Sequence, residues 1–417
     1  MKWPSAKFAE VAEIVTGNTP PKKDPDNYGP GIPWVKPPDL DAWEPVTQTA
    51  ETLSSKGQKL ARLLPEGTVM VCCIGSIGRV GIAGTTVATN QQINSLIFGP
   101  TINPKFGYYY CRHISQEFQA AARNAVVPIL NKSNFSKIEM PLPPLSEQRR
   151  IVEILDQADA LRKKRAEADA KAARILPALF YKMFGDPATN PKGWHKGVLG
   201  DVIAEVQYGT SVRADADGKG VAVIRMNNIN ASGGMDLTDI KYADLSENER
   251  KHYALEPGDI LFNRTNSKEL VGKTGLWRGE VLAVAASYLI RVRVDLAQVR
   301  PEFIWTYMNS RYIKQVLFDK CRRAIGMANI NAKELRALPL IIPPRQMQQA
   351  FVTQLEHAES LVKRGGSARV KLERLFSVLL HRAFTGDLTA KWREAHMKEL
   401  LQEMEQQAKA LNLRMES

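Results

Sequence analysis

Residues 141–161 read PLPPLSEQRRIVEILDQADAL, and residues 339–361 read PLIIPPRQMQQAFVTQLEHAESL. Each stretch places a proline pair ahead of a glycine-free run rich in helix-forming residues, which is typical of the start of a helix. Matching residues lie 200 positions apart: Pro143 and Pro343, Gln148 and Gln348, Leu155 and Leu355, Ala158 and Ala358, and Leu161 and Leu361. The chain therefore contains the same proline-then-helix passage twice, which indicates an internal duplication.

The duplication extends over both halves of the chain. Matching residues or motifs occur in the same order in each half: Trp3 and Trp194, Gly67 and Gly258, and GRVG (78–81) and GKTG (272–275). Their offsets grow from 191 through 194 to the 200 of the helical passages. Loop insertions in the second half would produce this one-directional growth, whereas chance matches would not keep one order.

The segment before each helical passage is rich in glycine, proline, asparagine and β-branched residues. Short apolar runs bounded by turn residues are typical of strands, and examples are GTVMVCCIG (67–75), GDILFN (258–263) and SYLIRVRV (287–294). We expect one or two shorter helices among these strands, near residues 105–122 and 301–319. Each half is thus predicted to be a β-rich module followed by a long helix.

The long helices carry an apolar heptad pattern. The positions that step alternately by three and four residues are Ile151, Ile154, Ala158, Leu161, Arg165, Ala168, Ala172, Ile175 and Leu179. The same positions plus 200 are Phe351, Gln354, Ala358, Leu361, Gly365, Ala368, Leu372, Leu375 and Leu379. A helix of about 40 residues is about 60 Å long, which is longer than a compact module needs. We predict that the two seams pack together as an antiparallel coiled coil; the alternative is two amphipathic helices on separate modules.

Local signals mark where the long helices break and end. Pro177 predicts a kink or restart between residues 173 and 177, because proline removes a helical hydrogen bond. Gly365-Gly366 is expected to weaken the second helix, since glycine is flexible. The Gly-Asp pairs that follow Phe184 and Phe384 are expected to stop the two helices.

The charge of the chain favours a polyanionic partner. The 417 residues include 57 lysines and arginines against 44 aspartates and glutamates, a net charge of +13. Nucleic acid is the first candidate, ahead of a membrane, and a merely basic protein is the alternative. The first residues lack the apolar segment of a signal peptide, and no run approaches the length of a membrane span. Because Cys72, Cys73, Cys111 and Cys321 show no zinc-binding spacing, we expect a cytoplasmic protein in a reducing compartment.

Three further motifs carry a resemblance to a known family. They are TPPKKDPDNYGPGIPWVKPPDL (19–40), LNKSNFSKIEMPLPPLSEQRRIVEILD (130–156) and FTGDLTAKWR (384–393). Their order and duplication make the chain, from residue 1 to about residue 393, similar to the specificity subunit of type I restriction–modification enzymes. The second half departs from the pattern, because Arg345-Gln346-Met347-Gln348 stands where a Glu-Gln pair would be typical. This departure puts a required role for Glu147 in doubt, but not the fold.

The resemblance implies an α+β fold with two β-rich target recognition domains in pseudo-twofold tandem, separated by two long antiparallel coiled-coil helices. Each domain would read one half of a split sequence in double-stranded DNA, and the helices would set the spacer between the half-sites. The implied bounds are 1–144 and 188–342 for the recognition domains, 145–187 and 343–387 for the long helices, and 388–417 for a C-terminal helical tail.

The resemblance also implies a non-catalytic subunit that acts within a complex. Its expected protein partners are two methyltransferase (modification) subunits and restriction-translocase subunits, with no membrane partner. S-adenosylmethionine, ATP and Mg²⁺ are expected only in those partner subunits, and no cofactor or metal is expected in this chain. The expected contacts to the partners lie at the ends of the long helices, at Phe184, Asp186, Phe384 and Asp387.

The residue types of the predicted loops agree with DNA recognition. Asn, Gln, Arg and Lys side chains hydrogen-bond base edges in the major groove, and Lys and Arg also bind phosphates. The candidates in the first half are Lys22, Lys23, Lys36, Arg79, Asn90, Gln91, Gln92 and Arg123. The candidates in the second half are Arg225, Asn227, Asn228, Asn263, Arg264, Asn266, Lys268, Lys273, Arg322 and Arg323. The arginines at 123, 322 and 323 precede the long helices and are expected at phosphates.

Two other functions fit parts of the sequence. A coiled-coil adaptor that assembles proteins would also use the long helices, although the basic and amide-rich loops suit it less. A self-contained methyltransferase or nuclease would need motifs that the sequence lacks, such as an NPPY-like tetrad or a cofactor-binding glycine loop. SKELVGKT (267–274) resembles a phosphate-binding loop, but Ser267 stands where the first glycine is required.

Overall fold

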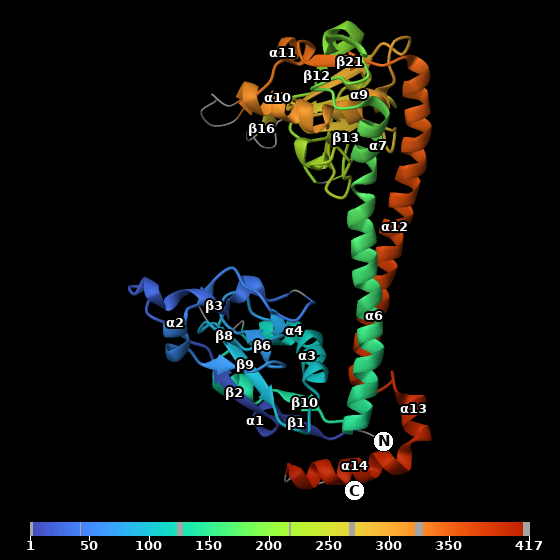
Figure 1. The fold of residues 1–417 in the computed structure, drawn as a ribbon. Coiled ribbons are helices and arrows are strands. Elements are labelled where there is room, and N and C mark those ends of the chain that lie inside the picture. The colour runs from blue at the N-terminus through green and yellow to red at the C-terminus, as the bar shows by residue number, and fades with distance from the viewer. Residues whose placement is uncertain are drawn as a thin grey trace. The chain divides into compact units, whose positions relative to one another are not determined.

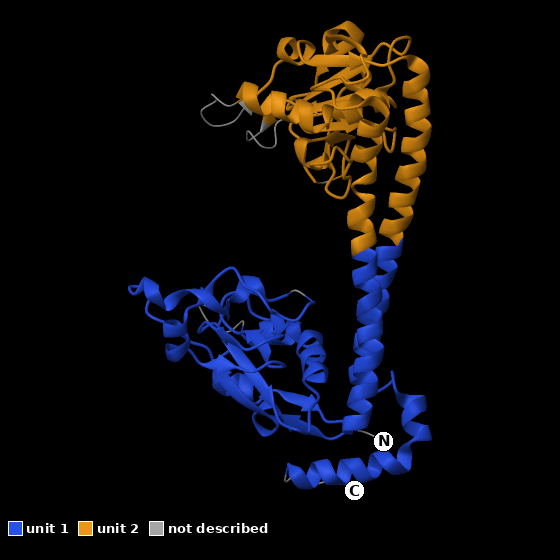
Figure 2. Cartoon of the chain, viewed as in Figure 1, with its two compact units in different colours: residues 1–166, 368–417 blue, residues 167–367 orange. Residues whose placement is uncertain are grey.

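The structure is a computed structural model, and it describes residues 3–41, 43–122, 128–216, 218–266, 272–321 and 328–411. The chain divides into two compact units (Figure 2). Unit 1 combines residues 1–166 with residues 368–417, and unit 2 is the continuous segment 167–367. Both boundaries fall within long helices, so each unit contains one part of each long helix.

The β-rich part of unit 1 contains two four-stranded sheets and a two-stranded ribbon (Figure 1). The first sheet has the order β2 (Ala12–Thr16), β9 (Ile93–Phe98), β6 (Val69–Cys72) and β7 (Val80–Ile82). The second has the order β4 (Thr52–Leu53), β3 (Tyr28–Val35), β8 (Val87–Thr89) and β5 (Leu63–Leu64). The ribbon pairs β1 (Ser5–Lys7) with β10 (Glu139–Pro141). The short helices are α1 (Phe8–Val11), η1 (Pro25–Asn27), η2 (Pro37–Asp39), α2 (Ser55–Leu60), α3 (Pro104–His113), α4 (Ser115–Ala121) and α5 (Lys132–Ser136).

The β-rich part of unit 2 repeats this plan. Its four-stranded sheet has the order β12 (Ile203–Tyr208), β19 (Leu289–Val294), β15 (Ile260–Asn263) and β17 (Thr274–Leu276). A three-stranded sheet has the order β14 (Lys241–Ala243), β13 (Val221–Ile224) and β18 (Ala283–Ala285). Two ribbons pair β11 (His195–Val198) with β21 (Pro339–Ile342), and β16 (Thr265–Asn266) with β20 (Ala328–Asn329). The short helices are η3 (Leu199–Val202), η4 (Met226–Asn228), α8 (Glu247–Tyr253), α9 (Pro301–Met308), α10 (Arg311–Cys321) and α11 (Ala332–Arg336).

The topology confirms the duplication inferred from the sequence. The strand order β2-β9-β6-β7 of unit 1 recurs as β12-β19-β15-β17 in unit 2. The order β4-β3-β8 recurs as β14-β13-β18. The pairs β3-β8 and β13-β18 are both parallel. Helices α3-α4 and α9-α10 lie where the sequence predicts them. Each half is therefore one β-rich module with the same internal plan.

Both modules use glycine at the same close approach of two backbone segments. A Cβ atom at Gly17 would lie 2.3 Å from the carbonyl oxygen of Asn90, and one at Gly209 would lie 2.2 Å from that of Ala285. Since no side chain fits at such distances, glycine is required where the chain leaves β2 and β12.

The long helices begin, break and end largely as the sequence predicts. Helix α6 (Leu145–Ala172) is followed by α7 (Ile175–Phe184), and α12 (Arg345–Thr385) is continuous. The break before α7 confirms the interruption predicted from Pro177, which lies in the first turn of α7. Gly365-Gly366 leaves α12 unbroken. The helices end at glycines with positive φ, 80° at Gly185 and 85° at Gly386, as the Gly-Asp pairs predict.

Within each unit, the two long-helix segments run antiparallel. In unit 1, Glu147 near the start of α6 contacts Arg393 just beyond the end of α12, whereas Arg162 further along α6 contacts Glu373 within α12. In unit 2, Phe184 at the end of α7 packs on Phe351 near the start of α12, with ring centroids 5.2 Å apart.

The predicted seam is wrong at four of its large apolar positions. Leu161, Ile175, Leu361 and Leu375 are 53%, 42%, 43% and 48% exposed. The buried residues follow the predicted ones by a single position: Leu155, Leu355 and Phe376. The apolar pattern missed this face because the face includes a charged residue, Arg162. The side chain of Arg162 is only 12% exposed and lies over the ring of Phe376. An arginine can pack through its guanidinium plane, which a purely apolar pattern does not detect.

The C-terminal segment forms two helices, α13 (Ala390–Ala395) and α14 (Met397–Ala410), that complete unit 1. They are joined to the start of α6 through Glu147, whose side chain is fully buried. Glu147 accepts hydrogen bonds from Arg393 Nε at 2.8 Å, Thr389 Oγ1 at 2.6 Å and Trp3 Nε1 at 2.9 Å. Gln407 of α14 adds a hydrogen bond to the carbonyl of Thr101. Glu147 therefore has a structural role in this chain, although the second half lacks it.

Candidate nucleic-acid interface

Corresponding 3₁₀ turns in the two modules carry several of the candidate residues. Turn η2 follows β3 in unit 1, and turn η4 follows β13 in unit 2. The backbone N–H of Lys36 donates to Asp39 Oδ2 at 2.8 Å, and that of Arg225 donates to Asn228 Oδ1 at 2.9 Å. The same local hydrogen bond thus closes both turns.

A cationic side chain from a neighbouring hairpin braces each turn. In unit 1, Arg79 Nη1 donates to the carbonyl of Pro37 at 3.3 Å. In unit 2, Lys273 Nζ donates to the carbonyls of Met226 at 2.9 Å and Ile229 at 2.6 Å. We call Lys36–Asp39 with Arg79, and Arg225–Asn228 with Lys273, the braced turns. Burial lowers the pKa of Lys273.

Several candidate residues of unit 2 make hydrogen bonds within the module. The ammonium group of Lys273 is used in bracing the turn. The side chain of Asn228 is also used within the module, because it is 1% exposed and donates to the carbonyls of Asp236 and Asp239. Arg225 is paired with Asp239 at 2.9 Å. These side chains fix the turn, and a direct contact with a base would require their internal bonds to break.

Other candidates of unit 2 differ widely in exposure. Asn227, at the tip of η4, is exposed. Arg264 lies over the ring of Tyr208 at 4.8 Å. Asn263 is fully buried, and neither atom of its amide has a hydrogen-bond partner. Such an unpaired amide costs about 1–3 kcal/mol, so Asn263 is not placed there for stability. The backbone of Asn266 pairs with β20.

The candidates of unit 1 form two groups. Lys22, Lys23 and Gln91 are exposed on loops, and Gln91 accepts a hydrogen bond from Thr19. The others are engaged internally: Lys36 with Glu51 and the ring of Trp34, Arg79 with Asp41, and Asn90 with Gln92. Only the first group is free to meet a ligand without rearrangement.

Four candidates, Arg123, Lys268, Arg322 and Arg323, lie outside the described residues. The sequence interpretation missed Arg62, which is exposed and links the end of β2 to α2. Its Nη1 donates to the carbonyl of Thr16 at 2.7 Å, and its backbone N–H donates to Asn18 at 3.0 Å. The basic run that ends at Arg62 was the available signal.

The residues expected to contact protein partners lie largely within the units. Phe184 is fully buried among Phe180, Phe303 and Phe351 in unit 2. Phe384 packs on Phe106, Tyr110 and His113 in unit 1. Asp186 and Asp387 accept local hydrogen bonds just after the helix ends. The ring of Phe184 belongs to a hydrophobic core, and the contact of these residues with protein partners stays a prediction.

Among the described residues, no group of three or more His, Cys, Asp or Glu side chains could hold a metal ion. No helix in the described part of the chain is long and apolar enough to cross a membrane. All four cysteines are buried, and burial raises the pKa values of the Cys72 and Cys73 thiols.

The family model for the type I restriction modification DNA specificity domain matches residues 1–169 and 191–365. The chain belongs to this specificity family. It is 27% identical over 303 residues to the EcoKI specificity subunit of Escherichia coli K12, a match that covers 68% of this chain and 64% of that relative. It is 21% identical over 411 residues to the MjaIX specificity subunit of Methanocaldococcus jannaschii, with 93% of each chain covered.

Solved structures share the fold. One, from work on complex assembly and conformational transition of a type I restriction–modification system, superposes with a TM-score of 0.60 at 18% identity, over 93% of this chain and 98% of the other. As a member of the specificity family, the chain is a DNA-recognition component and not a catalytic subunit. Each of its two specificity domains contains one braced turn.

A buried lysine of the second specificity domain should make the stability of the fold depend on pH. Lys314 Nζ donates to the carbonyl of Gly272 at 2.5 Å, and burial beside Lys273 lowers the pKa of Lys314 to about 8. Between this value and the ordinary 10.5, the unfolded chain binds the proton and the folded chain does not. Stability should therefore rise with pH in this window. Lys314→Gln should flatten the rise, as measured by denaturant unfolding across the window.

The first specificity domain already has a glutamine at the position comparable to Lys314, which supports the choice of glutamine as the replacement. There, the neutral Gln119 donates to the carbonyl of Ile77 at 3.2 Å in a comparable position. Parallel stability curves for the parent and Lys314→Gln proteins would show that the pKa of Lys314 is not lowered.

Proposed function

We propose that the two specificity domains read the two halves of one split target in double-stranded DNA. The observation that carries this proposal is the repeated braced turn, because it gives one chain two equivalent rigid platforms beside loops with hydrogen-bonding side chains. Asn227, Lys22, Lys23 and Gln91 are exposed candidates in the two domains. Amide side chains suit base edges and lysines suit phosphates, and the net charge of +13 favours the DNA backbone.

We also propose that the long helices act as an antiparallel coiled coil that sets the number of unread base pairs. In this assignment, residues 1–144 and 188–342 recognise DNA, and residues 145–187 and 343–387 are the spacer. The support is the antiparallel contact of the helix segments within each unit, together with the length of α12, 41 residues.

The proposed protein partners are two methyltransferase subunits and restriction-translocase subunits, which would hold S-adenosylmethionine, ATP and Mg²⁺. The helices expose apolar side chains that would suit such partners: Leu161 and Leu375 in unit 1, and Ile175 and Leu361 in unit 2. Leu161 and Leu361, like Ile175 and Leu375, are 200 positions apart. Two copies of one partner would therefore meet equivalent side chains.

The proposal is tested by mapping methylated adenines in the source genome with and without this gene. We expect deletion to remove one methylated motif, made of two short half-sites around a fixed gap, and reintroduction of the gene to restore it. The reason is that a shared methyltransferase loses its target when the recognition component is absent.

An unchanged pattern calls for direct binding of the purified chain to duplex DNA. The slope of log K against log salt should be about −0.9 per neutralised phosphate. Salt-independent binding, or none, together with an unchanged methylation pattern, would favour a protein-assembly adaptor.

A further inference from the structure

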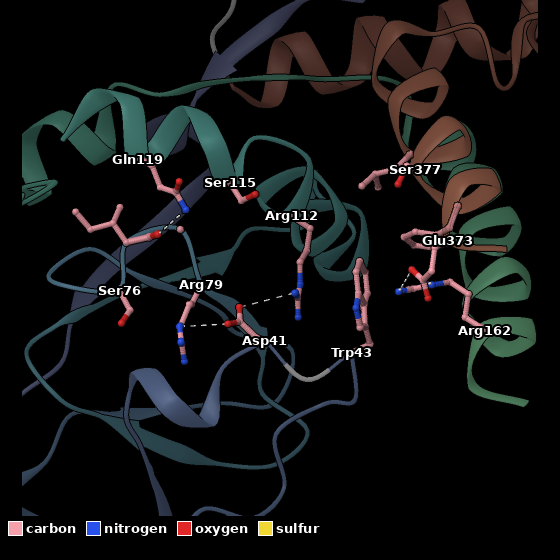
Figure 3. A pocket seen from close by; sticks show the side chains of 14 residues that line it. Asp41, Trp43, Ser76, Arg79, Arg112, Ser115, Gln119, Arg162, Glu373 and Ser377 are labelled. Carbon is pink, nitrogen blue, oxygen red and sulfur yellow. Dashed lines mark hydrogen bonds and ion pairs between the residues drawn. The ribbon is translucent and has the colours of Figure 1, made fainter. Parts of the chain in front are cut away.

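The indole of Trp43 lies between two arginine side chains in unit 1 (Figure 3). The guanidinium carbon of Arg112, on α3, is 4.3 Å from a ring centroid of Trp43, and that of Arg162, on α6, is 4.4 Å away. Phe376 of α12 packs edge-on against the same indole, with centroids 5.0 Å apart. We call Trp43, Arg112, Arg162 and Phe376 the Trp43 clamp. It joins a loop of the β-rich module to both long helices.

Hydrogen bonds to neighbouring side chains hold both arginines in the orientation in which they contact the indole. Arg162 donates to Glu373 from Nε at 3.0 Å and Nη2 at 2.7 Å, and to Asp159 at 3.1 Å. Arg112 Nε donates to the hydroxyl of Tyr108 at 3.2 Å. Each arginine side chain is only 12% exposed. Such partly desolvated and oriented cations make the strongest contacts with an aromatic face.

The clamp, in which Arg112 of α3 takes part, contacts the long helices at a second level. Nearer the start of α6, Tyr109 donates to Asp156 at 2.7 Å, and Phe106 packs on Phe384 with centroids 5.3 Å apart. Phe376 precedes Phe384 by eight residues, which is about 12 Å along α12. Contacts at two levels separated by this distance restrict rotation of the module about the helices more than contacts at one level.

The clamp is accompanied by other contacts between the module and the long helices. A cavity of about 590 Å³ lies beside the clamp, and both the module and the helices line it. Two further contacts lie at this level: the rings of Tyr109 and Phe376, with centroids 6.4 Å apart, and an ion pair between Lys163 and Glu44 at 2.8 Å. The exposed ion pair is weak and the ring contact involves Phe376 of the clamp itself, so the clamp is a substantial restraint there.

We propose that Trp43 is a positioning residue that fixes the angle of the first specificity domain on the helices and so narrows the range of gaps that the chain accepts. This inference rests on the proposed function, because a gap exists only if two half-sites are read. Unit 2 has a different link at the related place, where Arg278 donates to both carboxylate oxygens of Glu359 at 2.7 Å. Loss of Trp43 should therefore loosen the first domain and not the second.

The first test measures the angle without DNA. Spin labels at Lys59→Cys in the module and Arg374→Cys on α12 both lie at exposed positions of unit 1, and the native cysteines are buried. We expect a narrow distance distribution in the parent chain, a broad one in Trp43→Ala, and an intermediate one in Trp43→Phe. The matched control is Trp392→Ala, which removes an indole of the same unit that stacks on His396, away from the clamp.

The second test uses the full complex and duplexes whose gap is changed by one base pair. Trp43→Ala should reduce the preference for the native gap about tenfold, as expected for the loss of two cation–π contacts, while Trp392→Ala should keep it. Unchanged distances and unchanged gap preference in Trp43→Ala would overturn the inference. A parent complex that reads no split site, with the spin-label result still as expected, would overturn the proposed function and leave the clamp in place.

Discussion

Replacing Glu147 by methionine should lower the stability of unit 1 by about 3–5 kcal/mol, because it leaves the guanidinium of Arg393 buried without its carboxylate partner. The side chain of Arg393 is 10% exposed, and that of Glu147 is fully buried. The substitution also removes the acceptor for Thr389 and Trp3. Denaturant unfolding of the full chain, followed by tryptophan fluorescence, measures the loss.

The double variant, Glu147→Met with Arg393→Leu, should recover most of this loss, because buried ion pairs are commonly replaceable by apolar residues of similar size. The second half supplies a precedent, since Met347 occupies the position that matches Glu147 and is partly buried in the unit 2 core. The matched control is Glu153→Met, which breaks only an exposed pair with Arg150 on the same helix and should cost less than about 1 kcal/mol. Equal losses in the single and double variants would contradict an ionic origin.

Lengthening both long helices by one heptad should widen the recognised gap by about three base pairs. Seven residues add about 10.5 Å of helix, and B-DNA rises about 3.4 Å per base pair. The insertions belong after Ala168 and after Ala368, so that the helices lengthen together and keep their heptad phase. The methylated motif in cells that carry the variant gives the new gap directly.

The half-sites themselves should stay unchanged, because the insertions leave both β-rich modules intact. The control is a heptad inserted in α6 alone, which shifts its pairing with α12 and should abolish modification. A variant that remains active with the original gap would show that the helices do not set the spacer.

The fold was largely predictable because it repeats. Prolines, glycines and matching order marked both modules, and Pro177 located the break before α7. The seam register was not predictable from apolar residues, since Arg162 takes a buried position through its planar side chain and its contacts with Glu373 and Trp43. Sequence spacing identifies a helix, but which face of the helix is buried depends on the side chains of the neighbouring segments.

The candidate interface was less predictable. Arg79, Asn228 and Lys273 have the right chemistry for DNA, yet their hydrogen-bonding groups are used inside the braced turns. Whether a loop side chain is free depends on carbonyls far away in sequence, such as Pro37 for Arg79. Residue type and loop position therefore select a pool of candidates, and only the three-dimensional arrangement separates supports from contacts.

The discontinuous make-up of unit 1 imposes an order on synthesis. In sequence, unit 2 is one continuous segment between the two parts of unit 1, so the ribosome synthesises all of it before the C-terminal helices. Arg393 follows Glu147 by 246 residues, which corresponds to about 12–50 s at about 5–20 residues per second. Through that interval the Glu147 carboxylate has no Arg393 to meet. The module that is translated first is thus the last to close, and a chain truncated before residue 390 should contain a finished unit 2 beside an open unit 1.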